Sequence, residues 1–217
     1  MAVLPRLLLH TAAKPVLFAL ALLPFAWLMV GAFTDGLGAN PAEYLLRATG
    51  VWTLRFLCLT LAITPLRVIT NTPALVRFRR MLGLFVYFYG VMHLLSYSWF
   101  DKGFDVADIA RDIAKRPFIL VGFSAFVLLT PLAATSFNRA IRALGLRRWK
   151  TLHKLVYLIA GLAILHFFWM RAGKHDFTEV TLYGAIVSVL LGWRLLQFLR
   201  KKRPRPILGL RRQLSKQ

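Results

Sequence analysis

The sequence has few cysteines and few acidic residues, and it lacks the glycine-rich motif of dinucleotide-binding domains. Its 217 residues include a single cysteine, Cys58, which lies inside an apolar run, so the chain offers neither a disulfide framework nor a thiolate metal site. Asp and Glu together number 8, against 29 Lys and Arg, which gives a formal net charge of +21. The glycine-rich fingerprint of dinucleotide-binding domains is missing, which argues against a flavin or nicotinamide domain in this sequence.

Apolar residues, in contrast, are abundant. Hydrophobic side chains make up 58% of the sequence and its mean hydropathy is +0.61, which is more than a soluble domain of this length can bury. The first apolar run has full spanning length, so it does not read as a cleaved signal peptide. We therefore predict an all-α, polytopic membrane bundle of six transmembrane helices. The expected spans are residues 15–33, 50–66, 81–100, 117–135, 152–170 and 180–199, the second ending at Pro65 and the fifth forming one unbroken helix.

The charged residues divide between alternate loops. All 8 acidic residues lie in the loops after the first, third and fifth spans, whereas the remaining loops and both ends of the chain are basic. By the positive-inside rule, both termini are cytoplasmic. Residues 1–14 then form a cytoplasmic arm, 15–199 the transmembrane domain, and 200–217 a basic tail that can lie on anionic lipid. This alternation explains the positive charge by topology and membrane lipid, with no nucleic acid as partner.

The predicted outer loop of residues 101–116 is amphipathic and contains four acidic and four basic residues. It can fold as a short surface helix and serve as a docking surface for a partner. A solvated loop fits the same pattern. The sequence leaves both readings open.

Two histidines lie at similar depth in different spans. The third and fifth spans run in the same direction, and His93 and His166 each lie about four to seven residues from the outer end. Two neutral imidazoles on facing helices are the axial ligands of a b-type haem, each with its second ring nitrogen bound to a carbonyl or hydroxyl. We predict that this pair binds haem iron; an interhelical hydrogen bond is the alternative. The small residues expected to make room for the macrocycle are Gly83, Gly90, Gly161 and Ala163.

His153 lies at the inner end of the fifth span. Its offset of 13 residues from His166 corresponds to about 20 Å along a helix and to about 220° around it, so the two side chains do not share a face. His153 can bind a second haem with a non-histidine, water or outside partner, or it can be an ordinary hydrogen-bonded residue. His10 and His175 are expected to be solvated.

Several arginines are further candidates. Arg55 lies inside the second span, where it can neutralise a haem propionate or extend to the lipid headgroups. Arg77, Arg79 and Arg80 follow the inner turn before the third span. We interpret these three as topology signals, with binding of phosphate or flavin as a second use.

Four segments carry a resemblance to a known family. They read WTLRFLCLTLAITPLR (52–67), RRMLGLFVYFYGVMHLLSY (79–97), KRPFILVGFSAFVLLTPLAATS (115–136) and LRRWKTLHKLVYLIAGLAILHFFW (146–169). In this order they resemble the MsrQ (YedZ) family, the haem-binding membrane subunit of the bacterial periplasmic methionine sulfoxide reductase system. That family belongs to the ferric-reductase-like transmembrane superfamily, and the resemblance covers about residues 45–200.

The resemblance implies a function and a set of site residues. It implies a bacterial inner-membrane protein with b-type haem, one or two per chain, and FMN as a further cofactor. Electrons are expected to come from the quinone pool or a cytosolic flavin reductase and to pass to a periplasmic molybdopterin enzyme, MsrP, which carries out the substrate chemistry. The family's haem histidines correspond to His93, His153 and His166. Relatives in the superfamily that hold two bis-histidine haems have another histidine where this chain has Arg79 and Arg80, so the inner site lacks one expected ligand.

Two other classes of function remain open at this point. A stand-alone ferric reductase, or another haem reductase, is the nearest enzyme alternative, although it needs the missing flavin and nicotinamide domain. A membrane transporter or assembly factor with structural histidines is the non-redox alternative. Such a transporter normally has broken helices and buried acids, for which the sequence gives no sign.

Overall fold

The computed structural model describes residues 3–173 and 175–202, and every regular element in this part of the chain is a helix. Six helical stretches in it are long and apolar enough to cross a membrane. They are Ala13–Phe33, Pro41–Ile69, Pro73–Asp101, Pro117–Ala134, Leu146–Ala172 and Thr178–Arg200. The prediction of an all-α chain with six candidate spans is confirmed. Most of the predicted basic tail, from residue 203 onward, lies outside the described residues.

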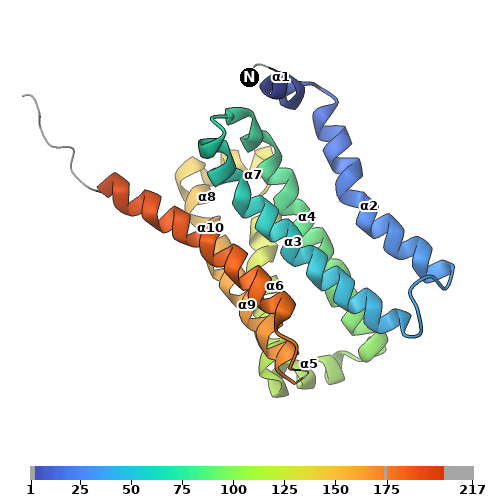
Figure 1. Ribbon diagram of the computed structural model, residues 1–217. Helices are drawn as coiled ribbons and strands as arrows, with labels where there is room; N and C mark the ends of the chain where they lie inside the picture. The colour runs from blue at the N-terminus through green and yellow to red at the C-terminus, as the bar shows by residue number, and fades with distance from the viewer. Residues whose placement is uncertain (1–2, 174, 203–217) are drawn as a thin grey trace, which may run out of the picture.

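The elements follow one another along the chain as α1 (Val3–Leu9), α2 (Ala13–Phe33), α3 (Pro41–Ile69), a 3-10 turn (Pro73–Leu75), α4 (Val76–Ser96), a π-helical turn (Tyr97–Asp101), α5 (Val106–Lys115), α6 (Pro117–Ala134), α7 (Asn138–Leu144), α8 (Leu146–Leu152), α9 (Leu155–Ala172) and α10 (Thr178–Lys202). At one end of the bundle lie α1, α7, α8 and the α3–α4 connection, and at the other lie α5 and the α2–α3 and α9–α10 loops (Figure 1). We call these the α7 end and the α5 end.

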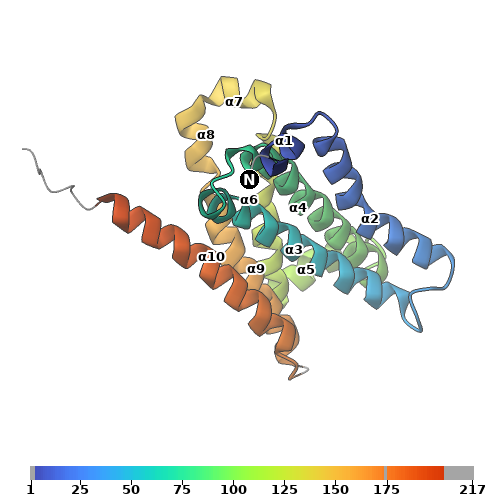
Figure 2. The ribbon, with the colours of Figure 1, turned by 45° about the horizontal axis from the view of Figure 1, so that its top comes forward.

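Four helices form the centre of the bundle. α3 packs mainly against α4, α6 packs mainly against α9, and α4 and α6 join these two pairs. α10 lies against α3 and α9, while α2 lies on the outside of α3 and α4 (Figures 1 and 2). The buried core includes Leu57, Leu61 and Val86, and Cys58 is buried among them. In this arrangement α4 and α9 can present side chains to each other, with α3 and α6 behind them.

The α3 helix is longer than predicted at both ends. It begins at Pro41, because the side chain of Asn40 caps it by accepting a hydrogen bond of 3.1 Å from the backbone N–H of Glu43. The prediction that Pro65 ends the helix was wrong. Proline at this position removes the N–H that would pair with the carbonyl of Leu61, and the guanidinium of Arg194 on α10 donates to that carbonyl at 2.7 Å instead. The helix therefore continues to Ile69.

The sequence analysis predicted one unbroken helix for the fifth span, and this prediction was wrong. A turn at His153 and Lys154 separates α8 from α9. There the backbone pairs over three residues rather than four, with Lys154 N–H donating to Thr151 at 3.1 Å and Tyr157 N–H to Lys154 at 3.0 Å. His153 consequently lies at a break between two helices.

α2 is fastened to the bundle by one tyrosine. The hydroxyl of Tyr89, on α4, donates to the carbonyl of Ala21 at 2.9 Å and accepts from the N–H of Phe25 at 3.1 Å. These two backbone groups pair with each other in an uninterrupted helix, so the hydroxyl is inserted into α2 beside Pro24. Tyr89 is fully buried and stacks on Phe56. The tyrosine both anchors α2 and satisfies its opened backbone.

The predicted outer loop forms the surface helix that was one of its two readings. Asp105 caps the start of α5: its side chain accepts a hydrogen bond of 3.0 Å from the backbone N–H of Asp108. It packs on α6 across the α5 end of the bundle (Figure 1). On this helix Asp112 is buried although it is an acid.

Candidate cofactor-binding site

His93 lies on α4 and faces the backbone of α3. Its Nδ1 is 2.9 Å from the carbonyl oxygen of Leu46. Because a carbonyl oxygen only accepts hydrogen bonds, the ring proton belongs on Nδ1, and Nε2 keeps its lone pair. The ring can approach the helix because residue 50 is glycine: a Cβ added to Gly50 would lie 3.0 Å from the Cε1 atom of His93.

His166 on α9 repeats this arrangement against α6. Its Nδ1 is 2.6 Å from the carbonyl oxygen of Phe118, which again assigns the proton to Nδ1. A Cβ added to Gly122 would lie 2.7 Å from Nδ1 and 2.8 Å from Cε1 of the imidazole. Each imidazole thus contacts a carbonyl of the neighbouring helix and fits into the space left by a glycine four residues further along that helix.

The two imidazoles face each other across the centre of the bundle. Their ring centroids are 6.2 Å apart and their planes are inclined by 75°. A metal ion bonded to the Nε2 atom of each ring at about 2 Å would hold the two ring centroids about 6 Å apart. Neither Nε2 atom has a hydrogen-bond partner among the described residues. The pair is therefore oriented as two ligands with free lone pairs.

Both rings line one cavity of about 690 Å³. This volume falls within the range of about 300–1,000 Å³ that is typical of cofactor pockets. The walls are mostly apolar and include Leu57, Val86, Phe126, Leu129 and Ile159. The polar lining residues gather towards the α5 end, where Arg47, Arg116 and Arg171 come from α3, the start of α6 and α9. The cavity thus combines an apolar interior with a charged mouth, at which the acids Glu43 and Asp101 accompany the three arginines.

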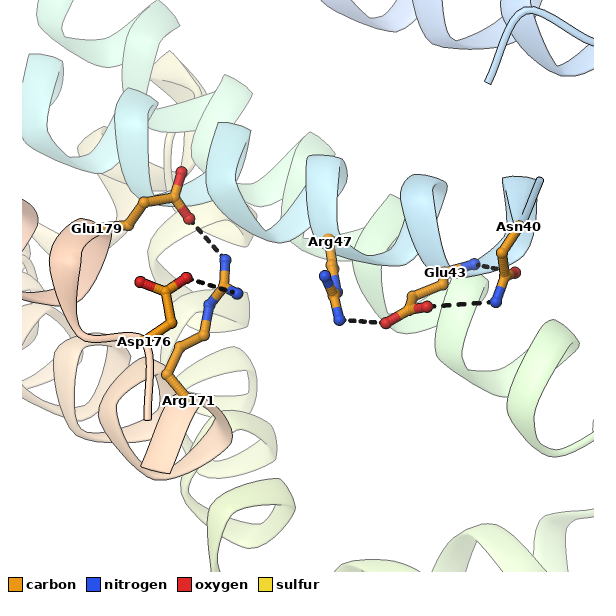
Figure 3. A network of polar contacts seen from close by, with 6 residues as sticks. All are labelled: Asn40, Glu43, Arg47, Arg171, Asp176 and Glu179. Carbon is orange, nitrogen blue, oxygen red and sulfur yellow. Dashed lines mark hydrogen bonds and ion pairs between the residues drawn. The ribbon is translucent and has the colours of Figure 1, made fainter. Parts of the chain in front are cut away.

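Two of these arginines are held by nearby acids (Figure 3). Arg171 donates to Glu179 at 2.7 Å and to Asp176 at 3.4 Å, linking the end of α9 to the start of α10. Arg47 pairs with Glu43 one turn earlier on α3, and Glu43 also accepts from the side chain of Asn40 at 3.3 Å. The Nε atom of Arg171 is buried and has no hydrogen-bond partner in the described part of the chain. These pairs fix two cationic groups beside the cavity mouth.

The ligand set restricts the metal group that fits. Among the described residues, no cluster of three or more His, Cys, Asp or Glu side chains is placed to hold a metal ion. Two opposed imidazoles supply only two ligands, which suits a metal that brings four in-plane ligands of its own, as haem iron does. The apolar walls and the arginines at the mouth suit a flat macrocycle with carboxylate substituents. The residues present therefore fit a haem.

The structure differs from the sequence analysis in the small residues that make room. Gly90 and Ala163 line the cavity as expected. Gly83 and Gly161 do not line it, so these two glycines do not make room there for a macrocycle. Gly50 and Gly122, which were not predicted, make room for the two imidazoles. A glycine inside an apolar span, facing a histidine-bearing span, was the available signal.

The predicted arginines lie away from this cavity. Arg55 lines a neighbouring cavity between α2 and α3, donates to the hydroxyl of Tyr183 at 2.9 Å, and lies over the ring of Trp52 at 4.5 Å. Arg79 and Arg80 lie towards the α7 end of the bundle, about 20 Å along α4 from His93. Arg80 donates to Asn138 at 2.6 Å. In their place, Arg47, Arg116 and Arg171 supply the positive charge.

The other histidines are separate from the pair. His153 does not line the cavity; its ring lies 4.0 Å from that of Trp149, and its Nδ1 contacts the carbonyl of the same tryptophan at 3.0 Å. Its Nε2 is buried and makes no hydrogen bond of standard geometry with the residues that the structure describes. His10 and His175 are exposed. The structure thus brings two of the three predicted ligand histidines together.

Comparison with known proteins agrees with this geometry. A family model described as the ferric reductase like transmembrane component matches residues 49–164, which is more than half of the chain. The fold and the site therefore define a membrane-embedded helical bundle of the ferric-reductase-like type. No solved structure matches the chain.

Individual relatives narrow the assignment. The chain is 75% identical over 198 residues to the protein-methionine-sulfoxide reductase heme-binding subunit MsrQ of Polaromonas naphthalenivorans (strain CJ2), a match that covers 91% of this chain and 90% of that protein. The subunits of the same name from Herminiimonas arsenicoxydans and Bordetella pertussis are 57% and 55% identical, over 83% and 87% of this chain and 83% and 91% of theirs. The chain belongs to the MsrQ family.

Proposed function

We propose that this protein is the haem b electron-transfer subunit of a bacterial methionine sulfoxide reductase system. Its electrons come from the quinone pool or a cytosolic flavin reductase, and its acceptor is a periplasmic molybdopterin-containing reductase of the MsrP type. One observation carries the proposal: the imidazoles of His93 and His166 face each other with ring centroids 6.2 Å apart and both Nε2 atoms free. The names of the relatives, which are haem-binding subunits of that reductase, support it.

The residues around the cavity account for cofactor binding. His93 and His166 would hold the haem iron, and the carbonyls of Leu46 and Phe118 fix the tautomer and the orientation of each ring. The apolar walls exclude water and lower the local dielectric constant. When bound there, haem supplies one-electron redox chemistry, so the chain itself needs no catalytic side chain.

The membrane orientation is part of the proposal. The α7 end of the bundle is rich in arginine and lacks acids in the sequence, which favours the cytoplasmic side. The cavity mouth then opens towards the periplasm, where the acceptor is. In this orientation both termini are cytoplasmic and the protein belongs to the inner membrane.

His153 is the candidate ligand of a second haem on the cytoplasmic side. Its buried Nε2, which makes no hydrogen bond of standard geometry with the described residues, supports that role. The second axial ligand has to come from a group other than the paired histidines, since these lie at the opposite level. FMN binding near Arg79 and Arg80 remains a proposal that rests on the family resemblance.

A visible spectrum of the purified protein tests the proposal. Wild-type protein should show a Soret band that shifts on reduction with dithionite, and His93→Ala and His166→Ala should each lose the bis-imidazole form. His153→Ala should retain it and should lower the haem content only if the second haem is present. Wild-type protein that stays colourless after reconstitution with haem would refute the proposal.

The electron donor can be identified with the same spectrum. Membrane vesicles or proteoliposomes containing the protein are supplied either with a quinol or with a flavin reductase and NADH. Reduction of the haem by one and not the other identifies the donor. Failure of both donors would refute the proposed route while leaving haem binding intact.

A further inference from the structure

A buried carboxylate lies directly behind the cavity mouth. Asp112 on α5 accepts hydrogen bonds from three donors: the hydroxyl of Tyr97 at 2.8 Å, the ammonium of Lys102 at 3.2 Å and Nε of Arg116 at 2.9 Å. Its side chain is 9% exposed. Burial alone would raise the pKa of Asp112, but the hydrogen bonds from Tyr97 and Lys102 and the charge of Arg116 outweigh it and hold the pKa below its ordinary value. The group is therefore ionised at neutral pH.

Two of these donors belong to the cavity itself. Tyr97 and Arg116 line it together with His93 and His166. Tyr97 lies in the π-helical turn that ends α4, and Arg116 immediately precedes α6. Asp112 thus connects α5 to the π-helical turn and to the start of α6, although its own side chain does not line the cavity.

Arg116 differs from the other two arginines of the mouth. Arg47 and Arg171 use their terminal nitrogens to bind acids of the protein. Arg116 binds Asp112 through Nε, and its terminal nitrogens have no hydrogen-bond partner among the described residues. A guanidinium anchored at Nε keeps two parallel N–H groups in the geometry that matches a carboxylate.

We propose that Arg116 binds a carboxylate substituent of the cofactor at the cavity mouth, and that Asp112 is the positioning residue that holds Arg116 there. The proposal rests on haem occupying the cavity between His93 and His166. A cation held beside the macrocycle stabilises its reduced form, because reduction adds negative charge. Arg116 therefore raises the reduction potential, and it does so only while Asp112 holds it in place.

The test is a double-mutant cycle read out as the midpoint potential of the purified haem protein. Arg116→Gln should lower the potential. In the Asp112→Asn background the same substitution should lower it much less, because Arg116 has already left the mouth. If Asp112 acted only as a nearby negative charge, Asp112→Asn would raise the potential and Arg116→Gln would keep its full effect, and that result would overturn the proposal.

Two further variants control the cycle. Asp108→Asn removes the same charge one turn earlier on α5, where the carboxylate binds Lys102 at 2.8 Å and does not contact Arg116, so the full Arg116→Gln shift should remain. Arg116→Lys keeps the charge, but a single ammonium bound to Asp112 cannot also present two parallel N–H groups to a carboxylate; it should lower the potential by less than Arg116→Gln, even if Asp112→Asn does not fold. An unchanged potential in Arg116→Lys and Arg116→Gln would also overturn the proposal.

The failure of this proposal is distinguishable from that of the proposed function. A protein that binds no haem refutes the function itself. A protein that binds haem through His93 and His166, but whose potential ignores Arg116 and Asp112, refutes only the carboxylate site.

Discussion

Replacing Gly122 by alanine perturbs the cofactor site through a single added carbon. The Cβ would lie 2.7 Å from Nδ1 and 2.8 Å from Cε1 of His166, whereas ordinary contacts begin near 3.4 Å. The imidazole has to retreat by about 0.7 Å, because its neighbour is the rigid backbone of α6. This displacement exceeds the tolerance of about 0.2 Å on metal–ligand distances.

The energetic cost follows from the same contacts. Overpacking costs about 1–3 kcal/mol, and displacing the ring also strains the 2.6 Å hydrogen bond to Phe118. Because glycine is a poor helix former, alanine returns up to about 1 kcal/mol to the stability of α6, so the bundle should still fold. A loss of 1–3 kcal/mol in the site corresponds to about 5- to 150-fold weaker haem binding.

Haem titration of the apoprotein, followed at the Soret band, measures this change. Gly50→Ala places its Cβ 3.0 Å from His93 and should have a smaller effect than Gly122→Ala. Gly161→Ala lies on the same helix as His166, meets no atom within 4 Å, and should bind haem like the wild type. Equal affinities for all three variants would refute the idea that these glycines set the position of the ligands.

Three further predictions concern the scaffold. Tyr89→Phe removes the hydroxyl between Ala21 and Phe25 and should lower the free energy of unfolding in detergent by about 1–2 kcal/mol. The control is Tyr87→Phe, which should leave the stability unchanged because the Tyr87 hydroxyl has no hydrogen-bond partner among the described residues. Equal stabilities of the two variants would contradict this role of Tyr89. Arg194→Met should destabilise the bundle by about 1–3 kcal/mol. The cost should be smaller in a Pro65→Ala background, because the carbonyl of Leu61 then regains a helical N–H donor. An equal cost in both backgrounds would show that Arg194 does not replace that donor. Because the pKa of Asp112 is lower in the folded than in the unfolded state, the stability that it adds is complete above about pH 4 and is lost as the pH falls through the folded pKa. Hydrogen exchange in α5, corrected for its intrinsic pH dependence, should therefore stay constant from about pH 7 to 5 and increase only below about pH 4, and a steady increase from pH 7 would contradict this.

The sequence was most informative where the length and spacing of apolar runs decide the structure. Six apolar runs predicted six candidate spans, because a membrane accepts only segments that satisfy their own backbone. The depth of His93 and His166 could also be predicted, since a helix advances by a fixed amount per residue. Whether the two rings turn towards each other could not, because that depends on how α4 and α9 pack.

The misses have a common physical cause. The effect of Pro65 depends on Arg194, which lies far along the chain and replaces the missing donor. The residues that make room for the imidazoles are on α3 and α6, not on the histidine-bearing helices. Likewise, Arg55 was a candidate because it is intramembrane, yet the arginines that line the mouth are Arg47, Arg116 and Arg171. In each case the decisive contact joins elements that sequence patterns treat separately.

Electron paramagnetic resonance of the oxidised, purified protein tests the central claim most directly, because it reports both the ligands of the iron and the angle between them. Two imidazoles inclined by 75° predict a strongly anisotropic low-spin ferric signal, and His93→Ala and His166→Ala should each abolish it. A purely high-spin signal in the wild-type protein, or a strongly anisotropic low-spin signal that survives both substitutions, would contradict ligation by this pair.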